Sequence, residues 1–271
     1  MPHAPTLASC ALAALLIPAL RAQDDADPPP ASGEPLVIDA EWAAVESSLY
    51  NLFRQVPELK ELGERGPAVP SAPLEPGALD ALRPPAKIEE GEVWKPDSAP
   101  LVELLKRFHP GARGRLRFSF HNGARAYLLE RSEERTDVLV RLHAEFQIAE
   151  DVWYTPAQFE GRLVWEDDAL VTLSLALPPR DTNVDTNAKL AEHGFLAADI
   201  GYCPRMRLRA RDAHEGPERD LAPARRALAL AFYRFAAIDW LPFPDAVARA
   251  RAEKKPLHVL LLFGTLDDES C

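Results

Sequence analysis

The residues between 101 and 211 alternate between apolar and polar side chains with unusual regularity. The longest run is Val138, Val140, Leu142, Ala144, Phe146 and Ile148, and a second run is Val171, Leu173, Leu175 and Leu177. Successive side chains of a strand point to opposite faces, so each run predicts a strand with one buried and one solvated face. The pattern therefore predicts an antiparallel, β-rich domain over residues 101–215.

A third alternating run precedes a turn signal. Leu116, Phe118 and Phe120 alternate with polar residues and are followed by Asn122-Gly123. An Asn-Gly pair between alternating segments is a strong signal for a tight hairpin. We therefore expect this run to pair with the strand that follows Gly123.

The first 22 residues have the pattern of a secretory signal peptide. Their apolar run, Ala11 to Leu20, is too short to cross a bilayer, which takes about 20 apolar residues. We therefore expect an exported protein, periplasmic or extracellular, without a transmembrane span beyond the signal. Residues 23–38 are acidic and rich in proline, and are expected to be disordered.

Two further segments precede the alternating region. Residues 39–62 have apolar side chains at intervals of three and four, which predicts a helix with Asp39 as its N-cap. Residues 63–100 contain Pro67, Pro70, Pro73 and Pro76 at intervals of three. That spacing favours polyproline II and predicts a Pro-rich linker.

Composition and charge exclude several classes of protein. Apolar residues make up 47% and charged residues 27%, as is ordinary for a globular chain. The net charge is −11, and no basic run is present that would neutralise phosphates, so nucleic acid is not an expected partner. No phosphate-binding loop is found and the seven histidines have no metal-ligand spacing, so we expect no cofactor-binding site and no metal site.

The last segment, residues 216–271, changes character. A nearly all-apolar helix from Pro223 to Asp239 implies burial against another element, and a short helix opens at Pro244. A continuous apolar run, Leu257 to Phe263, predicts a strand buried on both faces, and a loop ending in Cys271 follows it. This order is that of the first half of a thioredoxin-like domain. The predicted fold class is α+β, with an antiparallel β-rich domain followed by the start of an incomplete, truncated thioredoxin-like domain.

Four blocks of residues carry a family resemblance. They are Tyr154–Gly161, Asn183–Asp185, Asp199–Met206 and the closing Gly264–Cys271. In this order they resemble the selenoprotein N family. The resemblance implies that a selenocysteine follows Cys271 directly and that reading stopped at its codon, in what looks like a bacterial-type homologue. It also implies thiol/selenol oxidoreductase activity on a protein thiol or disulfide, with Cys271 as the cysteine of a Cys–selenocysteine pair. The truncated chain itself is expected to be inactive.

The residues next to Cys271 agree with that role. Asp267, Asp268 and Glu269 precede it, and nearby negative charge disfavours a thiolate. Cys271 therefore suits the resolving position better than the attacking one. The alternative is a non-catalytic exported β-rich module that binds a protein or glycan, which an exposed apolar patch on the sheet of residues 114–210 would support.

Other candidate residues have simpler interpretations. Asp181, Asn183, Asp185, Asn187 and Glu192 match the ligand spacing of an EF-hand loop, but Thr186 replaces the glycine of its sixth position. We therefore expect a polar loop, with calcium an unlikely partner. His143 is expected on the surface, His258 within a buried strand, and Cys203 as a small buried residue.

Overall fold

The computed structural model describes most of the chain after residue 33. The described residues are 34–48, 50–60, 64, 67, 69–109, 115–116, 123–155, 158–177, 183–190, 195–213, 219–238 and 240–259. All described residues belong to one compact unit, Ala31–Cys271. The predicted signal peptide lies outside them. No helix among the described residues is long and apolar enough to cross a membrane.

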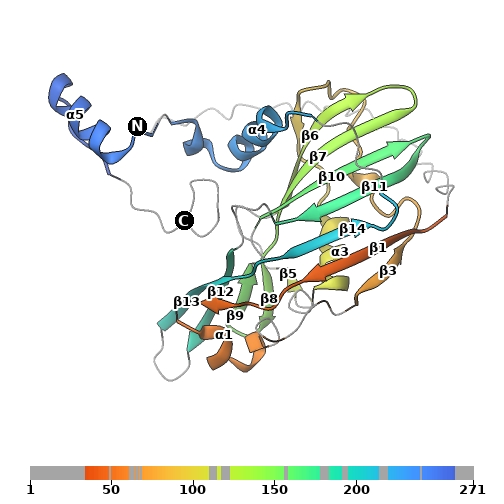
Figure 1. Ribbon diagram of the computed structural model, residues 1–271, viewed down its shortest axis with the longest axis horizontal. Coiled ribbons are helices and arrows are strands. Elements are labelled where there is room, and N and C mark those ends of the chain that lie inside the picture. The colour runs from red at the N-terminus through yellow and green to blue at the C-terminus, as the bar shows by residue number, and fades with distance from the viewer. Residues whose placement is uncertain are drawn as a thin grey trace, which may run out of the picture. The chain divides into compact units, whose positions relative to one another are not determined.

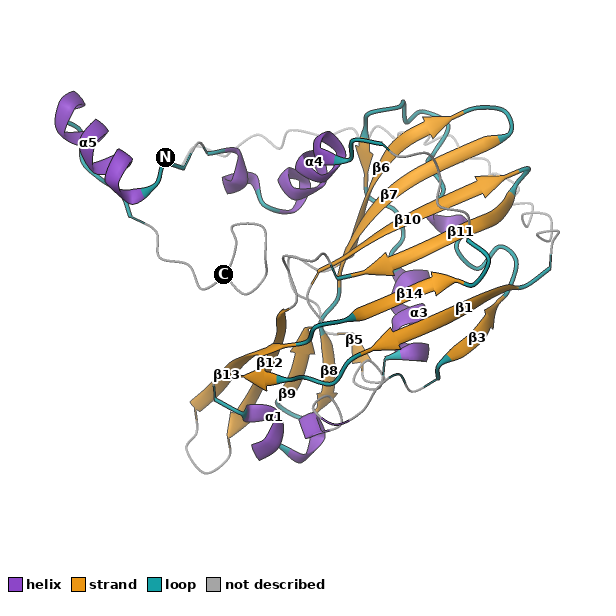
Figure 2. Ribbon diagram, in the orientation of Figure 1, coloured by secondary structure: helices purple, strands orange, loops and turns teal. Residues whose placement is uncertain are grey.

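The described strands form two antiparallel sheets (Figures 1 and 2). The first has the order β3 (Ser71–Leu74), β1 (Leu36–Trp42), β14 (Met206–Ala210), β11 (Ala169–Ala176), β10 (Gln158–Glu166), β7 (Arg135–His143), β6 (Gly123–Arg131), β4 (Val93–Trp94). The second has the order β2 (Ser47–Ser48), β13 (Phe195–Tyr202), β12 (Asn183–Leu190), β9 (Val152–Thr155), β8 (Phe146–Ala149), β5 (Arg115–Leu116). The predicted antiparallel, β-rich architecture is confirmed.

The long alternating run from Val138 to Ile148 is divided between the two sheets. Its first part is β7 in the eight-stranded sheet, and its last part is β8 in the six-stranded sheet. Ala144 and Phe146 are both fully buried, so the buried side chains continue without interruption where the chain passes from one sheet to the other. The alternation of the sequence therefore does not reveal the change of sheet. Consecutive strands also change sheets between β1 and β2, β9 and β10, β11 and β12, and β13 and β14. Such changes are typical of corners between sheets that share a core.

The predicted hairpin at Asn122-Gly123 is not the observed pairing. β5 pairs with β8, whereas β6, which starts at Gly123, pairs with β7. β5 and β6 thus belong to different sheets, so the hairpin prediction is wrong for these strands. Asn122 and residues 117–120 lie outside the described residues.

Helices are few, as an α+β class predicts. The longer ones are α3 (Ala99–Phe108), α4 (Ala222–Phe232) and α5 (Phe243–Glu253), and α1 (Leu52–Gln55) is a single turn. Short 3₁₀ helices span Pro57–Leu59, Asp80–Leu82 and Arg234–Ala237. The apolar side of α3, including Leu101, Leu105 and Phe108, is buried in the core that both sheets share.

The helix predicted over residues 39–62 is wrong. Residues 36–42 form β1, which pairs with β14 on one side and β3 on the other. Ile38, Ala40 and Trp42 are buried in alternation, and Asp39, the predicted N-cap, instead pairs with Arg211. The segment forms a strand because it has a partner strand on each side. The periodicity of its own sequence contains no information about those partners. Residues 36–38 are likewise ordered in β1, not disordered as predicted.

The Pro-rich linker predicted over residues 63–100 is also wrong for its described part. It contains β3, a 3₁₀ helix and β4, and its side chains Leu74, Leu82 and Trp94 are buried in the core. β3 is an edge strand of its sheet, where Pro73 is tolerated because the missing N–H faces away from the ladder. Proline spacing alone therefore misidentified an ordered segment.

The C-terminal segment follows the prediction in part. The apolar helix is present as α4 but ends at Phe232, and α5 has no buried residue. Residues 257–259 have no regular secondary structure, and the rest of the predicted strand lies outside the described residues together with Cys271. The thioredoxin-like domain therefore stays a prediction.

Candidate functional site

The described structure ends at residue 259, so the candidate site is the place where the segment leading to Cys271 is attached. Helix α4 lies against β6, β7 and β4 of the eight-stranded sheet (Figure 1). We call this contact the α4 interface. Its apolar centre consists of Ala224 and Leu228 of α4 and Leu139 of β7, all buried. β7 is thus buried on both faces, because Val138 and Val140 point into the main core.

A buried polar group lies at the C-terminal end of α4. This group, the His143 cluster, consists of Arg125, Arg141, His143, Gln158, Phe232 and Tyr233. Tyr233 Oη lies 3.2 Å from His143 Nδ1 and accepts a hydrogen bond from Gln158 Nε2 at 3.0 Å. The imidazole of His143 is stacked on Phe232, with ring centroids 4.0 Å apart and planes inclined by 6°.

The prediction that His143 lies on the surface is wrong, since it has no exposed surface. The polar side of β7 was expected to face solvent, but α4 covers it. The sequence did predict an apolar helix that must be buried against another element, which indicated that some outer face of the sheet is covered. It did not show which face.

Ion pairs join the polar side of α4 to the sheet. Arg225 donates to both carboxylate oxygens of Glu160 on β10, at 2.8–3.0 Å. This contact raises the pKa of the Arg225 guanidinium. Arg219, just before α4, pairs with Glu130 of β6. The helix is therefore fixed by ion pairs near its N-terminal end and by the His143 cluster at its C-terminal end.

A second buried polar group lies where the two sheets meet. Tyr154 Oη lies 2.9 Å from His109 Nε2, and the His109 ring contacts Trp42 with centroids 4.8 Å apart. Burial lowers the pKa of His109 to about 3, so its imidazole is neutral at physiological pH. Burial, with a smaller contribution from Cys203, raises the pKa of Tyr154 well above its ordinary value.

Cys203 is fully buried, as predicted. Its Sγ donates a hydrogen bond to the carbonyl oxygen of Ala43 at 3.1 Å, and burial raises the pKa of the thiol. A thiol in this environment is a poor nucleophile, because the thiolate is the reactive form. Cys203 therefore has a structural role at the corner between β13 and β14.

The other predicted site residues differ from expectation. Residues 183–190 are strand β12, paired with β9 and β13, so the predicted polar loop with EF-hand spacing is not formed there. His258 is exposed, not buried, because residues 257–259 are not part of a strand. Within the described ranges, no three His, Cys, Asp or Glu side chains are grouped to hold a metal ion.

Exposed apolar side chains are concentrated near the C-terminal segment. Between residues 115 and 210, Tyr202 is the exposed large apolar side chain of the described part. The patch that would support a non-catalytic binding module is therefore not found on the described sheet surface. By contrast, residues 238–259 expose Ile238, Trp240, Leu241, Phe243, Leu257 and Val259.

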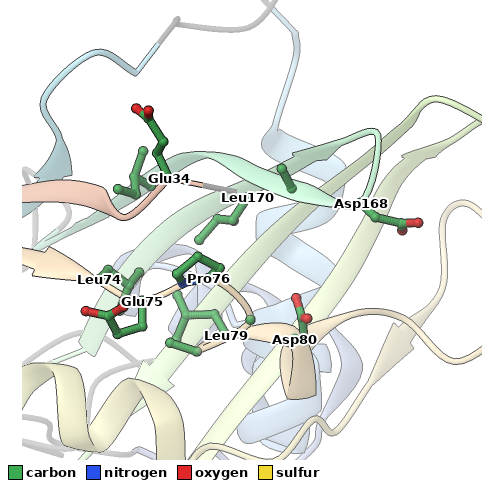
Figure 3. Close-up of a pocket in the computed structure, with 12 residues that line it drawn as sticks. Glu34, Leu74, Glu75, Pro76, Leu79, Asp80, Asp168 and Leu170 are labelled. Carbon is green, nitrogen blue, oxygen red and sulfur yellow. The ribbon is translucent and has the colours of Figure 1, made fainter. Parts of the chain in front are cut away.

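A small hollow at the edge of the eight-stranded sheet offers no room for a substrate. It is lined by residues 34, 36, 74–80 and 168–170, and its volume of about 30 Å³ holds only about two water molecules (Figure 3). Asp80 and Asp168 at its rim both pair with Arg83. The hollow is therefore a packing feature of the sheet edge.

Comparison with known proteins identifies relatives of the chain. Human selenoprotein N (Homo sapiens) is 29% identical over 325 residues, covering 94% of this chain and 55% of the human protein. Selenoprotein N of Mus musculus is 33% identical over 208 residues, and that of Danio rerio is 31% identical over 212 residues. Each of these two matches covers 62% of this chain and 37% of the relative.

Over most of its length the chain is similar to selenoprotein N. It spans about half the length of the human relative and less than that of the other two. No family model matches the chain. No solved structure matches it either.

The block Tyr154–Gly161, which resembles selenoprotein N, connects both buried polar groups. Tyr154 contacts His109 in one, and Gln158 contacts Tyr233 in the other. Glu160 pairs with Arg225, and a Cβ at Gly161 would collide with the backbone of Ser174 on β11. A selenoprotein N-like segment thus holds α4 against the sheet.

A second such block, Asp199–Met206, also has a structural role. The carboxylate of Asp199 accepts hydrogen bonds from the backbone N–H groups of Tyr50 and Leu52, at 2.9 and 2.7 Å. Asp199 thereby fixes α1 to β13. Its own side chain is only 3% exposed. Both blocks position the chain and do not form a reacting centre among the described residues.

Proposed function

We propose that the protein is a selenoprotein N-like thiol/selenol oxidoreductase in which Cys271 forms a redox pair with a selenocysteine at the next position. The observation that supports this most is the similarity to human selenoprotein N over 94% of the chain. The name of that relative states that it is a selenoprotein. Cys271 lies in the block that resembles the family most specifically, Gly264–Cys271.

The proposed exchange consumes one disulfide of a protein substrate. The selenolate attacks one sulfur, a Se–S bond forms, and the other sulfur leaves as a thiolate that takes up a proton. The Cys271 sulfur then attacks selenium, so that the second substrate sulfur leaves as a thiol. The substrate disulfide has gained two electrons and two protons. The pair supplies both electrons and the Cys271 proton, and solvent supplies the other proton, which the selenol released when it ionised. The reverse sequence oxidises a dithiol.

The carboxylates beside Cys271 support this division of roles. Asp267, Asp268 and Glu269 disfavour the thiolate of Cys271. A selenol is intrinsically more acidic than a thiol and stays ionised under the same charge. Selenium is therefore assigned the attack and Cys271 the resolving step.

The fold proposed for the reacting part is thioredoxin-like. The exposed apolar side chains at 238–259 support it, because a group of large apolar side chains exposed along one segment is typical of a segment that another element covers. The α4 interface would fix the start of that domain to the β-rich unit. The signal peptide predicted for residues 1–22 supports an exported compartment as part of this proposal.

Mass spectrometry of the full-length protein, produced from its own gene, tests the proposal. After oxidation and alkylation, we expect a peptide in which Cys271 and selenocysteine are unalkylated and two hydrogen atoms lighter than in the reduced form. A Cys271→Ser variant should lose this internal bond, and a Cys203→Ser control should keep it. Full alkylation of Cys271 in the oxidised protein would overturn the proposal, as would a gene whose next codon does not specify selenocysteine.

A further inference from the structure

The side chains of β14 that face away from the core form a row of arginines. Residues 205–211 read Arg-Met-Arg-Leu-Arg-Ala-Arg, and the three apolar residues between the arginines are buried. Successive side chains of a strand point to opposite faces, so the arginines lie on the outer face. We call Arg205, Arg207, Arg209 and Arg211 the arginine strip. Because β14 lies between β1 and β11 (Figure 1), the strip runs through the interior of the eight-stranded sheet and not along its edge.

The arginine strip lies on the same face of the sheet as α4 but at a different place. Arg209 is opposite Ser174 of β11, and Ser174 is in turn opposite Arg162 of β10. Arg162 is opposite Leu139 of β7, which packs against α4. Directly paired residues of neighbouring strands point to the same face. Because α4 contacts β7, β6 and β4, the strands β11 and β10 separate the arginine strip from the α4 interface.

Two arginines of the strip share one carboxylate. From β1, Glu41 pairs with both Arg205 and Arg207. From β11, the residues opposite the strip are Ser174 and Ala176, which carry no charge. Within the described part of the chain, Glu41 is the one ion-pair partner of Arg205 and of Arg207. Their two positive charges are therefore only half neutralised by this contact.

Most of the hydrogen-bond donors of these two guanidinium groups are available to a partner. A guanidinium carries five N–H groups, and Arg205 and Arg207 each use one nitrogen for Glu41. Their side chains are 66% and 42% exposed. Their charges also repel each other, because alternate residues of a strand are only about 6.8 Å apart. A second carboxylate beside them would accept hydrogen bonds and relieve this repulsion.

We propose that the arginine strip is a docking surface for an acidic peptide segment of a partner protein, bound in an extended conformation with a carboxylate at every second residue. Alternate side chains of an extended peptide have the same spacing of about 6.8 Å as the arginines. Each carboxylate can therefore meet a guanidinium in the two-pronged geometry that arginine favours. The net charge of the chain is −11, so the strip, and not the chain as a whole, attracts an acidic partner. This docking does not depend on the redox chemistry proposed above.

Fluorescence anisotropy with two labelled peptides of equal charge tests the spacing. One peptide has four aspartates alternating with glycines, and the other has four consecutive aspartates followed by four glycines. At low salt we expect the full chain to bind the alternating peptide about fivefold more tightly, because only every second side chain of an extended peptide reaches the strip. Equal binding of the two peptides, or no binding of the alternating one, would overturn the proposal. Tighter binding of a sulfated oligosaccharide that displaces the peptide would also overturn it.

Three variants locate the binding on the strip. The double variant Arg205→Gln/Arg207→Gln should bind the alternating peptide about tenfold more weakly. The matched control Arg226→Gln/Arg251→Gln removes two exposed arginines elsewhere and should bind like the wild type. Glu41→Gln removes the carboxylate that occupies Arg205 and Arg207, so it should tighten binding about threefold, a gain that misfolding cannot produce. If Glu41→Gln gives no gain, or the control loses as much as the strip variant, the strip is not the docking surface.

Discussion

Arg225 of α4 donates hydrogen bonds to both carboxylate oxygens of Glu160 on β10. Its Nε lies 3.0 Å from each oxygen, and its Nη2 lies 2.8 Å from Oε1. Such two-pronged arginine–carboxylate pairs are stronger and more directional than single contacts. The pair ties the helix that leads toward Cys271 to the centre of the eight-stranded sheet.

Breaking this pair should loosen α4 modestly. The Arg225 and Glu160 side chains are 51% and 25% exposed, so solvent screens the pair, and we expect a coupling energy of about 1 kcal/mol. A double-mutant cycle of Glu160→Gln and Arg225→Gln, followed by urea unfolding, measures it. Arg226→Gln, an exposed arginine one residue further, should change stability by less than about 0.5 kcal/mol. A coupling energy near zero would contradict the anchoring role.

Gly161 is required by the close approach of two strands. A Cβ at this position would lie inside the van der Waals contact distance of the Ser174 carbonyl oxygen, which belongs to the backbone and cannot move away. Gly161→Ala should therefore destabilise the fold by about 3 kcal/mol. Gly201→Ala is the comparison, because its Cβ would be too close only to the side-chain atom Val45 Cγ1, at 2.8 Å, whereas the nearest backbone oxygens lie at an ordinary contact distance of 3.7 Å. We expect it to cost about 1 kcal/mol in chemical denaturation, and the reverse order would refute the argument.

His109 should make the stability of the fold depend on pH. Burial lowers its pKa from 6.5 to about 3, so between these values the unfolded chain binds a proton that the native protein does not. Stability from this group is complete above pH 6.5 and is lost as the pH falls toward 3, by on the order of 5 kcal/mol. Denaturant unfolding at several pH values should show a flatter profile for His109→Gln than for the wild type. His258→Gln should leave the profile unchanged, and equal profiles for all three proteins would contradict the assignment.

The thiol of Cys203 should not react with alkylating reagents in the folded protein. Its thiol is buried, donates to the Ala43 carbonyl oxygen and has a raised pKa. We expect no alkylation of Cys203 by iodoacetamide at pH 8 under native conditions, and complete alkylation in denaturant, as read by mass spectrometry of its peptide. Rapid labelling in the native protein would show that the corner at Cys203 opens.

The sequence predicted the parts of the fold that local periodicity determines. The alternation of β7 and β11, the burial of Cys203 and the apolar character of α4 are all visible in the order of residues. It did not predict β1 or β3, because a seven-residue strand between β14 and β3 depends on partners far away in the chain. Asp39 has N-cap chemistry, but its partner is Arg211 across the ladder.

The same limitation explains the errors in the site. The polar residues of β7 have the period of a solvated face, and only the docking of α4 makes His143 an interior residue. The covering helix is 80–90 residues further along the chain, as the separation of 90 between His143 and Tyr233 shows. Cys271 was found from its family resemblance and its acidic neighbours and lies outside the described residues.

The pairing of β1 with β14 also determines when this part of the sheet can form during synthesis. Arg211 and Asp39, which pair at this ladder, are 172 residues apart in the chain. At a synthesis rate of about 5–20 residues per second, β1 leaves the ribosome roughly 10–30 s before its partner exists. During that interval β1 can pair only with the edge strand β3, so Ile38 and Trp42 are covered only in part. Strand β14 therefore joins the β3–β1 pair to the rest of the eight-stranded sheet late in synthesis.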